Sequence, residues 1–250
     1  MTGGAGKLTG NNRECSMLKM DRVSKVYRTD VVETCALRDF SVEVRTGEFV
    51  AITGPSGSGK TTFLSIAGLL EELTKGSYAL DNVPVAGLND AARSRLRNEK
   101  IGFVFQAFNL IPDLSIEHNI EIPLRYRGMS ARERRQRTSD ALARVGLTGR
   151  AQHRPGELSG GQQQRAAIAR ALAGSPRLLL ADEPTGNLDT QMARGVMELL
   201  EELHRDGATI VMVTHDPALA ARAQREVHLV DGQLVDSLPR SLQECGDAVA

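Results

Sequence analysis

A glycine-rich stretch in the first quarter of the chain carries residues suited to binding an anion. The stretch reads Gly54, Pro55, Ser56, Gly57, Ser58, Gly59, Lys60, Thr61 and Thr62, and its first eight residues fit the pattern G-x-x-x-x-G-K-[ST]. Glycines let such a loop wrap around one anion, and a helix starting near Lys60 adds the positive end of its dipole. Lys60 would neutralise the β- and γ-phosphates of a nucleotide, and the Thr61 hydroxyl would hold Mg²⁺. The stretch therefore predicts a nucleoside triphosphate site, with Thr62 included in the binding set.

Two adjacent carboxylates follow a short apolar stretch later in the chain. Asp182 and Glu183 come directly after the run Leu-Leu-Leu-Ala at 178–181. In an open parallel sheet, ligands bind beyond the carboxyl ends of the strands. We therefore expect Asp182 to reach the Mg²⁺ beside the phosphate loop, and Glu183 to take a proton from an attacking water. The competing interpretation is two solvated acids in the turn that starts at Pro184. It is less favoured because the same chain contains a phosphate loop.

A third motif, Leu158-Ser159-Gly160-Gly161-Gln162, has two interpretations. Ser159 and Gln162 have the spacing of a capping box that starts a helix. Two glycines early in a helix are costly unless the backbone must approach something closely. A helix start with glycine N–H groups and a serine hydroxyl is also a phosphate site. The residues alone leave both interpretations open.

The hydrophobic pattern predicts the elements that must position these motifs. Apolar and polar residues alternate from Met17 and again over 42–44, which indicates antiparallel strands. Continuous apolar runs indicate buried strands at 49–53, 101–105, 177–181 and 208–213. Helices are expected over 61–70, through most of 115–173, and over 192–204. Alternating strands and helices predict an α/β fold with an N-terminal antiparallel β subdomain and an α-helical subdomain inserted at about 107–173. We expect one domain over 16–240, between a flexible tail at 1–15 and a second tail at 241–250.

Composition excludes several classes of protein. The 250 residues contain 31 Lys plus Arg and 31 Asp plus Glu, and this zero net charge removes the basic excess typical of nucleic-acid binding. The longest stretch without Asp, Glu, Lys or Arg, 101–112, is shorter than the roughly 20 apolar residues of a membrane-spanning helix. Three widely spaced cysteines (Cys15, Cys35 and Cys245) and the lack of a secretory signal favour the cytosol.

Together, the motifs resemble the nucleotide-binding subunit of ABC transporters, over about 17–235. The resemblance implies a P-loop, RecA-like parallel-sheet core, and it identifies 158–162 as the family signature, which grips the γ-phosphate of ATP bound to the opposite subunit. It further implies that Tyr27 stacks on adenine and that Gln106 senses Mg²⁺ and the attacking water. Asp189 would lie in a loop crossing between the two active sites, and His215 would contact the γ-phosphate.

Two of these residues also have ordinary structural interpretations. Tyr27 taken alone is more often a strand aromatic. His215 lies between a predicted strand and the helix start at Asp216 and Pro217, where a structural histidine is common. The order and spacing of all the motifs favour the functional assignments together.

The number of motifs in the chain predicts a dimer. One phosphate loop and one Ser-Gly-Gly motif are separated by a helical insert, so a head-to-tail dimer would complete two sites with ATP between the subunits. Without a membrane segment, transport requires separate integral membrane permease subunits, and we expect the chain on the cytoplasmic face of the membrane. An apolar concentration near Gln106 is either core or a groove for a short permease helix. Its members are Phe103, Phe105, Phe108, Leu110, Ile111 and Leu114.

One charged cluster has no place in this scheme. It consists of Arg125, Arg127, Arg132, Arg134, Arg135 and Arg137. The cluster is either a solvated helix face or a contact for anionic lipid or an acidic partner.

The stretches 108–124, 126–129 and 181–189 are similar to the macrolide-exporter and lipoprotein-release branch of the family, whereas 71–75 and 81–82 depart from it. The expected function is thus an ATP-hydrolysing transporter subunit that uses ATP and Mg²⁺ and dimerises on ATP binding. The alternative is a soluble ABC-type ATPase acting on nucleic acid or ribosomes, a class that usually carries paired cassettes or long coiled-coil inserts.

Overall fold

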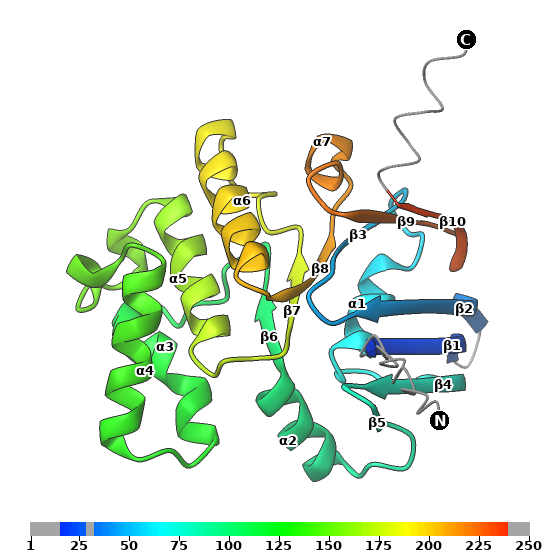
Figure 1. Ribbon diagram of the computed structural model, residues 1–250, viewed down its shortest axis with the longest axis horizontal. Coiled ribbons are helices and arrows are strands. Elements are labelled where there is room, and N and C mark those ends of the chain that lie inside the picture. Colours follow the sequence, from blue (N-terminus) through cyan, green and yellow to red (C-terminus); the bar gives the residue numbers. More distant parts are fainter. Residues whose placement is uncertain (1–15, 29–32, 240–250) are drawn as a thin grey trace, which may run out of the picture.

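The computed structural model describes residues 16–28 and 33–239. Both predicted tails, 1–15 and 241–250, lie outside this part of the chain. The described residues form two sheets with helices packed around the larger one (Figure 1).

The smaller sheet is antiparallel and comes from the first third of the chain. Its strands, in spatial order, are β2 (Glu33–Arg45), β1 (Ser16–Arg28), β4 (Lys75–Leu80) and β5 (Val83–Pro84). Leu18 pairs with Val44 on one side and with Leu80 on the other. All three side chains are buried together with Phe40, so this sheet turns one face inward. The antiparallel strands predicted near Met17 and at 42–44 are part of it.

The larger sheet has six strands. Their spatial order is β10 (Gln233–Pro239), β9 (Arg225–Val230), β3 (Phe49–Thr53), β8 (Thr209–Val213), β7 (Leu178–Asp182) and β6 (Ile101–Val104). The strands from β9 to β6 are parallel, and β10 pairs antiparallel with β9 at one edge. The parallel-sheet core is confirmed, because each apolar run predicted as a buried strand coincides with β3, β6, β7 or β8.

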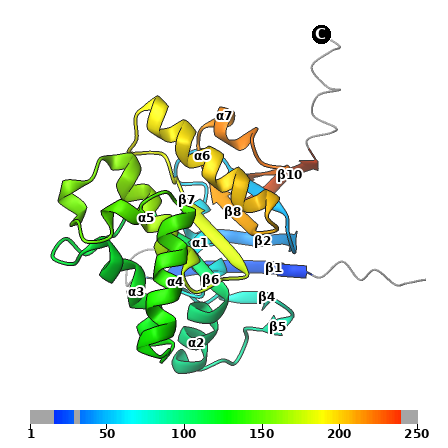
Figure 2. The ribbon, with the colours of Figure 1, turned by 60° about the vertical axis from the view of Figure 1, so that its left-hand side comes forward.

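The two faces of the larger sheet pack into two different cores. Along β3, Phe49 and Ala51 join one core, whereas Val50 and Ile52 join the other. The first core is shared with α3 (Ile116–Tyr126), α4 (Ala131–Arg144), α5 (Gly160–Leu172) and α6 (Thr190–Arg205). The second is shared with α1 (Lys60–Ala67) and the smaller sheet. The sheet therefore separates α1 from α5, as Figures 1 and 2 show from two directions.

Three helices fill the stretch that the sequence predicts as helical between 115 and 173. They are α3, α4 and α5, and two short 3₁₀ turns, Thr148–Arg150 and Pro155–Glu157, lie between α4 and α5. Gly128 and Gly146 interrupt the stretch with φ of 69° and 72°, a conformation that glycine adopts at little cost. Serine side chains cap the starts of all three helices (Ser115, Ser130 and Ser159). Within the described residues, no helix has both the length and the apolar character needed to span a bilayer.

The first helix is shorter than predicted. It ends at Ala67 instead of Leu70, because Leu69 has a left-handed φ of 58° and the N–H groups of Leu69 and Leu70 turn back to the carbonyls of Ile66 and Ser65. The buried hydroxyl of Tyr78 donates to the Ala67 carbonyl at 2.6 Å, which satisfies one of the free carbonyls at the helix end. Burial also raises the pKa of Tyr78.

The remaining helices are α2 (Asp90–Lys100) and α7 (Pro217–Ala220).

A buried asparagine fixes the segment that connects β6 to α3. Asn119 is fully buried, and its Oδ1 accepts from the Ile111 N–H at 2.7 Å. Its Nδ2 donates to the carbonyls of Ile111, Leu114 and Ser115 at 3.0 to 3.2 Å. One side chain thus satisfies the Ile111 N–H and the Leu114 carbonyl, and it is a second donor to the carbonyls of Ile111 and Ser115, which also accept backbone N–H groups.

Replacing this side chain should destabilise the fold. Asn119→Leu removes the side-chain partner of the Ile111 N–H and of the Leu114 carbonyl, whereas the carbonyls of Ile111 and Ser115 keep backbone donors, and we expect the free energy of unfolding to fall by about 1–3 kcal/mol. Urea denaturation measures this change. The matched control is Gln136→Leu, because Gln136 is an exposed amide on α4 whose loss should change stability by less than about 0.5 kcal/mol. Equal stability of the two variants would contradict the anchoring role.

Candidate functional site

The ends of three parallel strands meet at one edge of the larger sheet. Ile52 of β3 pairs with Val213 of β8, and Asp182 of β7 pairs with the same Val213. The loop that starts at Gly54, the segment 214–216 and the turn after Asp182 therefore emerge side by side. This edge is where a doubly wound sheet binds ligands.

The phosphate loop needs glycine because its backbone passes close to other backbone. Gly54 has φ of 144°, and a β-carbon there would lie 2.0 Å from the Leu229 carbonyl oxygen. Gly59 has φ of 103°, and a β-carbon there would lie 2.4 Å from the Ala36 carbonyl oxygen. Neither position accepts a side chain without a shift of the backbone. The loop is therefore held between β9 and β2.

The start of α1 is built to receive an anion. Among the described residues, no acceptor faces the backbone N–H groups of residues 59–62, and the first turn contains no acidic side chain. Ser58, just before these residues, has a buried Oγ with no hydrogen-bond partner among the described residues. Buried Lys60 donates from Nζ to the carbonyls of Gly54 and Pro55, at 2.8 and 2.7 Å. These donors and this cation fit a polyphosphate.

The acid pair lies opposite this cation at the end of β7. Asp182 is half-buried, and its pKa is raised, first by burial and then by the charge of Glu183, while Lys60 lowers it. Glu183 has a left-handed φ of 41°, which is unusual for a residue with a side chain. Its Oε1 lies 2.7 Å from Nδ1 of His215, which follows β8. The structure thus brings Lys60, Asp182, Glu183 and His215 together.

Gln106 lies just beyond β6 and contacts the loop that contains Asp189. Its Nε2 donates to Asn187 Oδ1 at 3.3 Å, and Asn187 Nδ2 donates to the Gln106 carbonyl at 3.0 Å. Gly186 makes room for this amide, because a β-carbon there would lie 2.7 Å from Gln106 Nε2. Asp189 is the N-cap of α6, and its carboxylate accepts from the Met192 N–H at 2.8 Å. Gln106 and the loop that contains Asp189 are therefore neighbours.

The signature motif forms the capping box predicted from its spacing. Ser159 Oγ accepts from the Gln162 N–H at 3.4 Å, and Gln162 Oε1 accepts from the Ser159 N–H at 3.1 Å. Its glycines face other side chains of the same chain. A β-carbon on Gly160 would lie 3.2 Å from Leu188, and one on Gly161 would lie 3.1 Å from Met192. The motif packs on the opposite face of the sheet from α1, so one chain does not bring it to its own phosphate loop.

Tyr27 lies near the end of β1, where it pairs with Thr34 of β2. Two residues later, the Ala36 carbonyl of β2 approaches Gly59 of the phosphate loop. Tyr27 is 38% exposed, so its ring is accessible beside the loop. It is also covered in part by Lys25, whose Nζ lies 4.9 Å from the centre of the ring.

Gln164 is a site residue that the sequence analysis misses. It is fully buried, and its Nε2 donates to the carbonyls of Phe105 and Pro184, at 3.3 and 2.6 Å. It thus ties α5 to Phe105, the residue before Gln106, and to the turn after Glu183. Its sequence signal is weak, because Gln162, Gln163 and Gln164 are adjacent and nothing local distinguishes the buried one.

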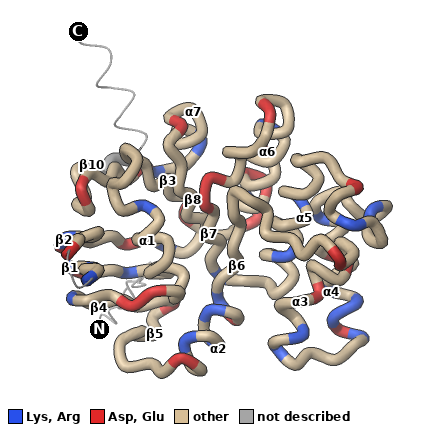
Figure 3. Tube along the Cα trace, turned by 180° about the vertical axis from the view of Figure 1, so that it is seen from behind, with Lys and Arg blue, Asp and Glu red and all other residues tan. Residues whose placement is uncertain are grey.

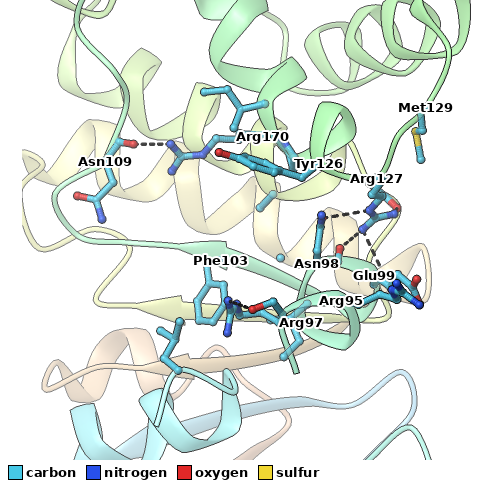
Figure 4. Close-up of a pocket in the computed structure, with 18 of the residues that line it drawn as sticks. Arg95, Arg97, Asn98, Glu99, Phe103, Asn109, Tyr126, Arg127, Met129 and Arg170 are labelled. Carbon is cyan, nitrogen blue, oxygen red and sulfur yellow. Dashed lines mark hydrogen bonds between the residues drawn. The ribbon is translucent and has the colours of Figure 1, made fainter. Parts of the chain in front are cut away.

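A groove of about 1410 Å³ lies between α2, β6, α3 and α5 (Figure 4). Its apolar part includes Phe103 and Phe105, whose rings stack 5.4 Å apart, and the exposed Ile111. Three of the six apolar residues predicted near Gln106 therefore line the groove, whereas Leu110 packs against the core. Several arginines surround it: Arg95, Arg97, Arg127 and Arg170.

The arginine cluster predicted over 125–137 does not form one continuous face. Arg125 and Arg134 both pair with Glu121, and the hydrogen bond from Arg134 is the largest cause of the lowered pKa of this carboxylate. Arg127 turns inward to the carbonyls of Asn98 and Gly174. Arg137 pairs with Glu133. Exposed Arg132 and Arg135 have no ion-pair partner among the described residues, and Figure 3 shows basic positions along α2 and α4.

The sequence is similar to those of several known proteins. The model of the ABC transporter family matches residues 37–186. The chain is 48% identical over 231 residues to YvrO, an uncharacterized ABC transporter ATP-binding protein of Bacillus subtilis, and covers 98% of it with 92% of its own length. It is 44% identical over 219 residues to the macrolide export ATP-binding/permease protein MacB of Hyphomonas neptunium. That match covers 88% of this chain but 34% of the relative, so the chain spans about a third of the MacB length.

Solved structures have the same fold. The dimeric, post-hydrolysis ATP-binding cassette MJ0796 bound to ADP and Pi, from Methanocaldococcus jannaschii, superimposes with a TM-score of 0.82 at 43% identity, covering 90% of this chain and 99% of that one. CbiO1 of Clostridium perfringens, part of the CbiONQ transporter complex, gives 0.84 at 27% identity, covering 94% and 93%. The chain belongs to the ABC transporter family, as an ATP-binding subunit that hydrolyses ATP.

Proposed function

We propose that this subunit powers export by separate membrane permeases, with substrates of the macrolide or lipoprotein type. The observation that carries the catalytic part is the convergence of Lys60, Asp182, Glu183 and His215 at one edge of the sheet. The relatives named as macrolide export proteins support the export direction. This role would hold the chain at the cytoplasmic face of the membrane through its permease.

Different residues would bind the phosphates and the Mg²⁺ of the nucleotide. The N–H groups of residues 59–62 and the Ser58 hydroxyl would bind the phosphates. The Lys60 ammonium group, which donates to the carbonyls of Gly54 and Pro55, would turn toward the phosphates. Thr61, Asp182 and Gln106 would hold Mg²⁺, which supplies charge neutralisation at the phosphates. Asp182 suits this role, because burial and Glu183 already disfavour its charged form and a nearby cation would relieve that cost.

Glu183 is the proposed general base. Its carboxylate would take the proton of the attacking water, and His215, 2.7 Å away, would hold that carboxylate and contact the γ-phosphate. The left-handed backbone of Glu183 and its N–H bond to the Val213 carbonyl, at 2.9 Å, fix where the side chain starts. Tyr27 would stack on the adenine beside the loop.

A second copy of the chain would complete each site. Within one chain the sheet separates α1 from the signature helix, so Leu158, Ser159, Gly160, Gly161 and Gln162 would act on nucleotide bound to the partner. Asp189 would lie at the dimer interface. The dimeric form of the MJ0796 cassette supports this arrangement. ATP would then be buried between two head-to-tail subunits.

The groove beside Gln106 is the proposed docking place of a short permease helix. Its apolar floor would receive apolar side chains of that helix, and Figure 4 shows Tyr126, Arg127 and Arg170 around it. Gln106 lies at the end of the strand that forms the floor, so docking would reach the nucleotide site directly.

Glu183→Gln should separate binding from turnover. We expect the variant to bind ATP with unchanged affinity and to lose about 10²–10⁴-fold in turnover, because the general base is absent. It should also accumulate as an ATP-bound dimer in light scattering. Glu198→Gln is the matched control, since Glu198 is exposed on α6. A variant that stays monomeric at saturating ATP would contradict the proposed dimer with ATP buried between its subunits.

Asp182→Asn should stabilise the chain when no nucleotide is bound. The folded-state pKa of Asp182 lies above its unfolded value, so its ionisation costs stability above the folded pKa. The gain in melting temperature should be complete at pH 8 and should shrink as the pH falls toward about 4, the ordinary value for Asp. The control Asp113→Asn removes an exposed carboxylate. A pH-independent gain would contradict the burial argument.

Ile111→Glu should uncouple the subunit from its permease. The new carboxylate would lie in the apolar part of the groove, so we expect recovery of integral membrane protein with the tagged chain to fall about tenfold. ATP binding by the isolated chain should be unchanged. The control is Val83→Glu, which places the same charge on exposed β5. Stable association with ribosomes or DNA in place of membrane protein would favour the soluble alternative.

A further inference from the structure

The segment 71–75, which departs from the expected branch pattern, contacts β1 just before Tyr27. Lys25 Nζ donates to Glu71 Oε2 at 2.5 Å and to the Glu72 carbonyl at 2.8 Å. The Val26 N–H donates to Thr74 Oγ1 at 3.0 Å, and the Thr74 N–H donates to the Ser24 carbonyl at 2.7 Å. The segment therefore binds β1 through both backbone and side chains.

Lys25 carries this contact to the ring of Tyr27. Its side chain is 13% exposed, so the ammonium group is held between the segment and the strand. The same Nζ lies 4.9 Å from the centre of the Tyr27 ring, within the range of a cation–π contact. An otherwise exposed ring near the end of a strand thus has a fixed cation on one face.

The position of α1 indicates which face of the ring remains for a ligand. The phosphate loop lies at the start of α1, whereas Glu71 and Glu72 follow its end. Eight helical residues separate the two by about 12 Å. Lys25 is held at the far end and covers one face of the Tyr27 ring, so a base that stacks on this ring would use the opposite face.

We propose that Lys25, held by Glu71, is a positioning residue that fixes the Tyr27 ring for stacking on the base of the nucleotide. This inference rests on the proposed role of Tyr27 as the adenine platform. Lys25 makes no contact with the phosphates in this arrangement. Its effect should therefore appear with ligands that carry a base and be absent with those that do not.

Calorimetric titration of four chains in a Glu183→Gln background tests this. The probes are ATP and inorganic tripolyphosphate, which has the phosphates without the base. We expect Lys25→Met to weaken ATP binding about two- to fivefold, because the Tyr27 ring is no longer held in one orientation for the base, and to leave tripolyphosphate binding unchanged. Lys25→Arg should restore ATP affinity, because Arg also places a cation over the ring. Lys19→Met, on the exposed side of the same strand, should match the parent.

A double-mutant cycle with Tyr27→Ala separates positioning from general stability. In that background, Lys25→Met should cause no further loss of ATP affinity, because the ring it positions is absent. Parent-like ATP binding by Lys25→Met, or equal losses for ATP and tripolyphosphate, would overturn the inference. A parent chain that binds ATP no better than tripolyphosphate would instead refute the adenine platform, and the role of Lys25 with it.

Discussion

The parallel register of β3, β8 and β7 is the constraint on which the site depends. Ile52, Val213 and Asp182 lie at one level at the ends of these strands, so the phosphate loop, His215 and the acid pair emerge together. Burial on both faces fixes this register, because a slip of one residue would exchange the side chains of β3 between its two cores. The geometry of the catalytic groups is therefore set by the hydrophobic core.

The same sheet also divides the site. The helix that follows the phosphate loop packs on one face and the signature helix packs on the other. The two are nevertheless joined through contacts at the edge. Gln164 bonds to Phe105, next to Gln106, and to the turn after Glu183, and Gly160 and Gly161 pack against Leu188 and Met192 beside Asp189. Movement of the helical region would thus reach the proposed nucleotide site through direct contacts.

Local patterns in the sequence were sufficient to predict the core strands and the capped helices. Continuous apolar runs identify β3, β7 and β8, and the spacing of Ser159 and Gln162 identifies the cap that the structure contains. The contact partners could not be predicted. Arg127 turns to carbonyls of Asn98 and Gly174, residues 29 and 47 positions away, which splits a cluster that looks continuous in sequence.

The end of α1 shows the same limit, because it depends on the Tyr78 hydroxyl from a strand of the other sheet. The sequence indicated no role for Lys25 and only weakly one for Gln164, for a related reason. Their importance comes from burial and from partners in other elements, Glu71 in one case and Phe105 and Pro184 in the other. The predicted roles of the site residues themselves follow from the motifs and remain predictions.

The central claim is that each ATP site combines the phosphate loop of one chain with the signature of another. Mixing two inactive variants, Lys60→Ala and Ser159→Arg, tests it most directly by ATP turnover. Each variant alone should be inactive, and the equimolar mixture should regain turnover, because a mixed dimer contains one site with both halves intact. A mixture as inactive as its components, despite proven mixed dimers, would contradict the account.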